Sequence, residues 1–204
     1  MNELKNSINT LFNLQTQIHL AVETLNEIGN NYETLREIKL DNFFDKNTNL
    51  ETSSHTLISS YAIILFCSFM DEYEKYFNQS ELEFIEKERI LRVKRKNSPG
   101  IKRIKKWKDL KKYRNYLAAH NFRINGKSFF SNEFEKLEFK IPNTISEKNL
   151  FSGIIYIICQ NIKNEFPEII QMFNINERMI DKISFIGEQI DNEKELSELY
   201  ELMI

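Results

Sequence analysis

Residues that interrupt or cross-link a polypeptide are scarce in this chain. Only five glycines and three prolines occur among its 204 residues, and these two residue types are the strongest breakers of regular structure. Leu, Ile, Glu and Lys are abundant instead, and such residues favour helices. The sequence therefore predicts long helices with few interruptions.

Cysteine is also rare, and its positions exclude the common metal sites. Cys67 and Cys159 are far apart, and each lies in an apolar run. Neither belongs to a CxxC pair or a Cys/His cluster, which are the usual zinc-binding patterns. We expect two buried, reduced thiols, no disulfide, no metal and no cofactor, as in a reducing cytoplasm.

The chain lacks a hydrophobic run long enough to cross a membrane. The most apolar stretch, 56–70, has about 15 residues and is followed by Asp71 and Glu72, whereas a transmembrane helix needs about 20. Residues 1–10 are polar and lack the apolar core of a signal peptide. The expected location is the cytoplasm, with no membrane partner.

Helical periodicity dominates the rest of the chain. Apolar residues recur at helical spacing over 4–28, and 56–77 reads as a buried central helix. Polar residues over 41–54 indicate a loop. Asn97-Ser98-Pro99-Gly100 predicts a break, with one helix before it (81–94) and another after it (99–120).

The second half contains one segment without helical periodicity, around 122–146. Asn125-Gly126 is a tight-turn signal, so this insertion is predicted to be irregular or to contain a small β-hairpin. A helix follows it to about Phe166, Pro167 suggests a kink or a restart, and further helices are expected after residue 175. The predicted fold is an all-α helical bundle, as a single domain over 1–204.

Positive charge is concentrated in a basic band at residues 87–114. The band holds 14 of the 28 basic residues and only two acidic ones, so its charge is +12 in a chain of net charge −2. Such a band suits a polyanion, and Trp107, Tyr113 and Tyr116 are placed to stack on unpaired bases. Solvation of the band, or pairing with the acidic remainder of the chain, remains an alternative. The leading RNA-binding candidates are Lys102, Arg103, Lys105, Lys106, Lys108, Lys111, Lys112 and Tyr116.

The band ends in the run Arg114-Asn115-Tyr116-Leu117-Ala118-Ala119-His120. A fixed cation and an imidazole are what phosphodiester cleavage without a metal requires. On an ideal helix Arg114 and His120 lie about 120° apart, with about 9 Å of rise. Three options remain open: a long Arg reaches round, His120 lies at a frayed end, or two copies meet at a twofold axis. As an alternative, His120 simply caps the helix C-terminus.

The same seven residues resemble the R-x(4–6)-H motif of the HEPN superfamily, including the polar residue after the arginine. The resemblance implies a helical bundle, usually dimeric, with the two motifs meeting at the interface. It also implies a metal-independent endoribonuclease of a prokaryotic defence or toxin–antitoxin system, with a possible antitoxin or regulatory partner. His120 would move the proton of the ribose 2′-hydroxyl, Arg114 would stabilise the transition state, and Asn115 would orient His120 or the phosphate.

Two other functions fit the same sequence. HEPN-like domains without catalysis serve as modules that bind RNA or a partner protein. A plain helical oligomer, in which the basic band pairs with the acidic remainder, would bind no RNA at all. RNA cleavage and RNA binding assays distinguish the nuclease, the binding module and the plain oligomer.

Overall fold

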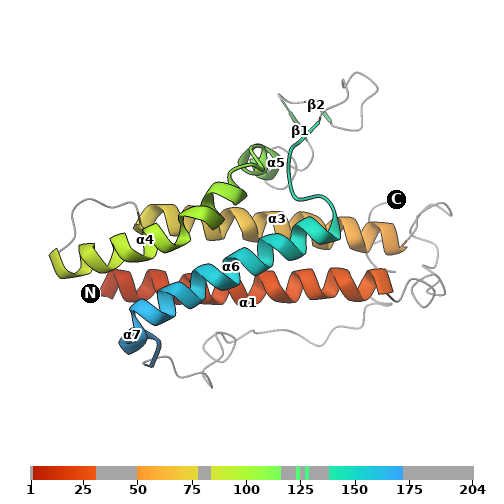
Figure 1. Ribbon diagram of the computed structural model, residues 1–204. Coiled ribbons are helices and arrows are strands. Elements are labelled where there is room, and N and C mark those ends of the chain that lie inside the picture. Colours follow the sequence, from red (N-terminus) through yellow and green to blue (C-terminus); the bar gives the residue numbers. More distant parts are fainter. Residues whose placement is uncertain are drawn as a thin grey trace, which may run out of the picture. The chain divides into compact units, whose positions relative to one another are not determined.

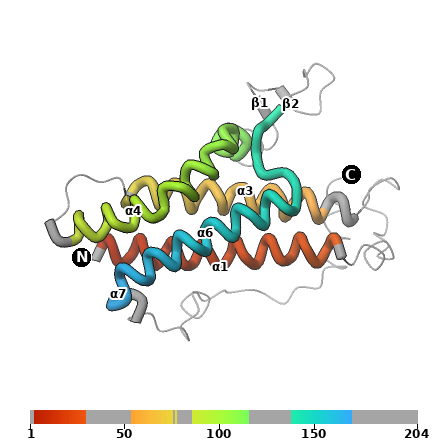
Figure 2. The backbone as a smooth tube through the Cα atoms, viewed as in Figure 1, coloured from red at the N-terminus to blue at the C-terminus, as the bar shows by residue number. Residues whose placement is uncertain are grey.

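The structure, a computed structural model, describes residues 2–30, 50–77, 84–115, 123–124, 127–128 and 138–171. The chain divides into two compact units, Met1–Ile170 and Gln171–Ile204, and the described residues fall in the first, apart from Gln171. They are helical except for short connections and one small hairpin (Figures 1 and 2). The predicted all-α fold is confirmed, while the single domain over 1–204 stays a prediction.

Among the described residues, the core of the first unit is made mainly by long helices that pack against one another (Figure 1). Helix α1 (Asn2–Asn30) packs against α3 (Leu50–Phe77) and against α6 (Ile145–Glu165), and α6 packs against α4 (Phe84–Ile104). The helices expected over 4–28 and 56–77 are therefore confirmed. The loop expected over 41–54 is wrong for residues 50–54, which are the first turns of α3. Their polar sequence is compatible with a helix end.

Aromatic rings join the helices at the centre of the unit. The ring of Phe151 on α6 stacks on Phe66 of α3, with 3.9 Å between ring centroids. Its other neighbour is Trp107, at 5.5 Å. All three rings are buried, and stacked aromatic pairs contribute beyond the area they bury. This aromatic column fixes the segment after α4 against the core.

Helix α4 corrects the sequence prediction most clearly. It runs unbroken through Pro99 to Ile104, so the predicted break at 97–100 and the predicted helix over 99–120 are wrong. Asn97 is buried, donates to the Tyr73 hydroxyl (3.3 Å) and accepts a hydrogen bond from Asn161 (2.7 Å). These bonds tie α3, α4 and α6 together. Tertiary contacts thus outweigh the local breaker signal.

The chain turns after Ile104 instead, and the short helix α5 (Leu110–Tyr113) follows. Helix α6 begins at a capping box, in which Thr144 accepts from the Glu147 backbone and Glu147 bonds back to Thr144. The helix expected to end near Phe166 is confirmed, as is the restart at Pro167, the first residue of α7 (Pro167–Gln171).

A hairpin lies where the insertion was predicted. Strand β1 (Arg123–Ile124) pairs antiparallel with β2 (Lys127–Ser128), around the Asn125-Gly126 turn signal. Residues 138–144 are irregular and lead into α6. The helices expected after residue 175 lie outside the described residues. Within the described ranges, no helix combines the length and apolarity that crossing a bilayer requires.

Candidate nucleic-acid interface

The turn between α4 and α5, residues 105–109, presents the C-terminal part of the basic band. Hydrogen bonds from two sides hold it. Asp109 exchanges two bonds with Lys140, through its backbone N–H (3.2 Å) and its carboxylate (2.8 Å). The Trp107 indole donates to Glu147 at the start of α6 (3.2 Å). This part of the band therefore lies on a turn held by hydrogen bonds, whereas the sequence predicted one helix over 99–120.

Trp107 is not available to stack on bases, contrary to the sequence prediction. Its side chain is 4% exposed, and its ring faces Phe151. The Arg103 guanidinium covers the ring at 4.1 Å from its centroid. Tyr113 is half-buried, with its ring edge-on to Phe139 at 5.5 Å between centroids. Both aromatic residues hold the turn in place.

Two carboxylates of α3, Asp71 and Glu74, form ion pairs with cationic side chains of the basic band. Glu74 lies 3.1 Å from the Lys105 ammonium and 3.4 Å from the Lys111 ammonium. Lys111 also pairs with Asp71 (2.8 Å), and Asp71 pairs with Nη1 of Arg114 (2.5 Å). These five side chains form the α3 ion-pair chain, which links the α4–α5 turn to the candidate catalytic arginine.

The pKa values of three of these groups, Asp71, Lys111 and Arg114, are shifted in the direction that favours their charged forms. Burial raises the pKa of Asp71, but hydrogen bonds from Lys111 and Arg114 outweigh burial and hold it below its ordinary value. The hydrogen bond to Asp71 in turn raises the pKa of Lys111 and that of Arg114. Opposite charges at close range favour the charged forms. The two ion pairs of Asp71 therefore persist across the physiological pH range.

Arg114 is partly sheltered, with 27% of its side chain exposed. Its backbone N–H donates to the carbonyl oxygens of Leu110 and Lys111 and so continues the turn of α5. Nε of Arg114 donates to the Asn115 side chain (3.3 Å). Asn115 thus contacts the guanidinium directly. Its predicted contact with His120 or a phosphate stays a prediction, because His120 and Tyr116 lie outside the described residues.

The other predicted RNA-binding residues fall into two groups. Lys102, Lys106 and Lys108 are exposed, and they form no ion pair with the described part of the chain. Arg103 lies over Trp107, and Lys112 lies 5.6 Å from the Phe139 ring centroid. Eleven of the band's 14 basic side chains are exposed: Lys87, Arg92, Lys94, Arg95, Lys96, Lys102, Lys105, Lys106, Lys108, Lys111 and Lys112.

Sequence reasoning missed Asp71 and Glu74. Asp71 enters the sequence prediction only as one of two acidic residues after the apolar run, and Glu74 is not singled out there. Their spacing of three residues on a predicted helix places both on one face, and that was the available signal. Which cations they meet depends on how α3 packs against α5 and the preceding turn, and periodicity does not reveal this.

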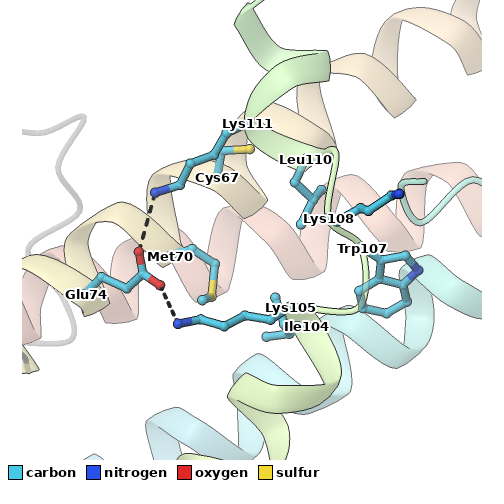
Figure 3. A pocket seen from close by; sticks show the side chains of 9 residues that line it. All are labelled: Cys67, Met70, Glu74, Ile104, Lys105, Trp107, Lys108, Leu110 and Lys111. Atoms are coloured by element: carbon cyan, nitrogen blue, oxygen red, sulfur yellow. Dashed lines mark hydrogen bonds and ion pairs between the residues drawn. The ribbon is translucent and has the colours of Figure 1, made fainter. Parts of the chain in front are cut away.

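A cavity of about 140 Å³ lies beside the ion-pair chain, between α3 and the α4–α5 turn (Figure 3). Met70, Ile104 and Leu110 give it an apolar lining. Figure 3 shows Glu74 extending between Lys105 and Lys111, with an ion pair to each. The cavity thus combines an apolar interior with a charged mouth.

Both cysteines are buried free thiols, as predicted. Burial raises the pKa of Cys67 to about 11 and that of Cys159 to about 12. Neither is therefore a thiolate near neutral pH, and a thiol lacks the nucleophilicity of a thiolate. Among the residues that the structure describes, no three His, Cys, Asp or Glu side chains gather as a metal site.

Comparison with known proteins gives no relative. No protein-family model matches the chain, and neither does any curated protein or solved structure.

Proposed function

We propose that this protein is a HEPN-like, metal-independent endoribonuclease that acts as a homodimer in the cytoplasm, in a prokaryotic defence or toxin–antitoxin system. Attack of a ribose 2′-hydroxyl on the adjacent phosphate forms the new P–O bond, and the 5′-oxygen leaves. The products are a 2′,3′-cyclic phosphate and a 5′-hydroxyl. His120 transfers the proton of the 2′-hydroxyl, and Arg114 stabilises the negative charge that develops on the phosphate.

The observation that carries the proposal is the setting of Arg114. The Asp71 carboxylate holds one nitrogen of its guanidinium, and Asn115 contacts another. A guanidinium has five N–H donors in a fixed fork, so donors remain for a phosphate after these contacts. Exposed lysines of the same band lie just before it in the chain. An anchored arginine at the end of a cationic surface suits binding of a phosphodiester backbone.

The first prediction tests the reaction itself. Purified protein incubated in EDTA should cleave single-stranded RNA but not a 2′-O-methyl RNA of the same sequence, because the methyl group removes the attacking hydroxyl. Mass spectrometry should find cyclic phosphate ends, and the His120→Ala variant should leave the RNA intact. Cleavage of the methylated strand, or cleavage that requires an added divalent metal, would contradict this mechanism.

The second prediction concerns the lysines that have no described ion pair. Replacing Lys102 and Lys106 by Ala in the His120→Ala background should lower the salt dependence of RNA binding. Each lost phosphate contact on a single strand reduces the log–log slope by about 0.7, so the slope should fall by about 1.4 in a fluorescence-anisotropy titration.

The control for that experiment removes two exposed lysines outside the band, Lys75 on α3 and Lys163 on α6. Both pairs of substitutions remove the same charge, but only the band pair should change the slope. Equal slopes for the two double variants would show that the band does not contact the RNA backbone.

A non-catalytic binding module is the second candidate. The α3 ion-pair chain favours it, because Asp71 and Glu74 neutralise part of the positive charge beside Arg114. Partial neutralisation weakens the stabilisation of a transition state more than it weakens binding by the lysines further along. Salt-sensitive binding of RNA that is never cleaved would select this function.

A further inference from the structure

We propose that the cavity beside the ion-pair chain is a binding pocket for one unpaired pyrimidine base, with cytosine preferred over uracil. This inference rests on the proposed function in one respect, that the natural ligand is single-stranded RNA. The pocket itself follows from the size, lining and charge of the cavity.

Size selects a single ring. The cavity of about 140 Å³ is close to the ~150 Å³ cavity that accommodates benzene in an engineered protein core. A six-membered pyrimidine ring matches that space, and its exocyclic groups can extend into the mouth. The two fused rings of a purine are too large to enter to the same depth.

The lining suits the faces of an aromatic ring. Met70 and Cys67 supply two sulfur atoms from α3, and Leu110 faces them from α5. Sulfur and aromatic rings make favourable contacts. Cys67 and Met70 are 1% and 5% exposed, so the side chains that carry the two sulfur atoms are buried.

The mouth supplies polar partners for the edge of the base and for its phosphate. Glu74 bonds to Lys105 and Lys111, and a carboxylate has further acceptor sites beyond these two. A carboxylate accepts from the cytosine 4-amino group, whereas uracil presents an oxygen at that position. Three lysines at the cavity, Lys105, Lys108 and Lys111, outnumber the one glutamate and favour an anionic nucleotide.

The pocket is also connected to the candidate catalytic arginine. Lys111 lines the cavity and pairs with Asp71, and the other oxygen of Asp71 holds Arg114. A base in the pocket therefore brings the phosphate of its own nucleotide toward the same cluster of cations. The proposed nuclease would then cleave next to a cytidine in preference to a uridine.

Trp107 gives a direct readout, because it lines the cavity and is the only tryptophan in the chain. Its fluorescence is measured during titration with cytidine 5′-monophosphate, uridine 5′-monophosphate or ribose 5-phosphate, with excitation at the red edge, where nucleotides are transparent. The cytidine nucleotide should give a saturable change and bind at least about fivefold tighter than the uridine nucleotide. Ribose 5-phosphate should give no change at the same concentration.

Two variants test the assignment to this cavity. Cys67→Leu fills the space and should abolish the response, while a thermal unfolding curve checks that the variant is folded. Glu74→Gln preserves the shape but lets the amide donate to uracil, so the preference for cytosine should disappear. The matched control is Glu165→Gln, since Glu165 pairs with Arg92 of α4 (2.8 Å), and α4 also carries part of the basic band, but Glu165 does not line the pocket.

The outcomes distinguish failure of the proposed pocket from failure of the proposed nuclease function. RNA cleavage together with equal responses to all three titrants, or with none, would overturn the pocket and leave the proposed function intact. A selective response to the cytidine nucleotide without RNA cleavage would support the pocket and count against the nuclease. A selective response that survives Cys67→Leu in folded protein would also overturn the pocket.

Discussion

Replacing Arg114 by Ala should reduce the rate of RNA cleavage by at least about 100-fold, in line with the loss of a single preorganised donor from an active site. The structure makes this substitution informative, because Asp71 already positions the guanidinium before any substrate arrives. Little reorganisation is then needed when charge develops on the phosphate. Single-turnover kinetics with saturating protein would measure the rate of the chemical step.

The matched control is Arg92→Ala. Arg92 also belongs to the basic band and also pairs with a carboxylate of another helix, Glu165, at 2.8 Å. Both substitutions remove one ion-paired arginine, but Arg92 lies near the α6–α7 junction, away from the candidate site. Its rate should stay within about threefold of wild type, a difference of under about 1 kcal/mol. An Arg114→Ala variant as active as Arg92→Ala would remove Arg114 from the mechanism.

Replacing Phe151 by Ala should lower the free energy of unfolding by about 3–5 kcal/mol. Phe151 is fully buried and stacks with both Phe66 and Trp107. A cavity at that point removes contacts from α3, from α6 and from the α4–α5 turn together. For a chain of this size the melting temperature should fall by about 6–20 °C, as followed by far-ultraviolet circular dichroism.

Tyr156→Ala is the control on the same helix. Tyr156 is 54% exposed, and substitutions at such surface positions usually change the free energy of unfolding by within about 0.5 kcal/mol. The comparison distinguishes loss of the aromatic column from loss of an aromatic residue in α6 generally. Similar destabilisation by both variants would show that the column is not the main support of this region.

Local sequence patterns were sufficient to predict a helix or a hairpin where one physical effect determines the structure of the segment. The apolar spacing of 4–28 and 56–77 predicted α1 and α3, because burial of one face, or of nearly the whole helix, decides these segments. The Asn125-Gly126 signal predicted the hairpin, since those residues favour the backbone of a tight turn. In each case neighbouring residues carry the information.

The same reasoning failed where residues distant in the sequence determine the environment of a side chain. Asn97 looked like part of a breaker, but Tyr73 and Asn161 satisfy its side chain inside the bundle. Trp107 looked like a base-stacking residue, but α6 supplies Phe151 and Glu147 to bury and bind it. For the candidate site, the position and charge of the basic band could be predicted, but its pairing with α3 could not.

Gly100 was part of the predicted helix break, but in the structure it lies inside α4, where it allows close contact with α6. A methyl group added at its α-carbon would lie 2.8 Å from Cγ2 of Ile154 on α6, a separation that carbon atoms do not tolerate without movement. The missing side chain therefore sets how deeply the two helices approach each other. Since α4 leads directly into the turn that walls the cavity, any bulk gained at this crossing would be transmitted to the width of the pocket.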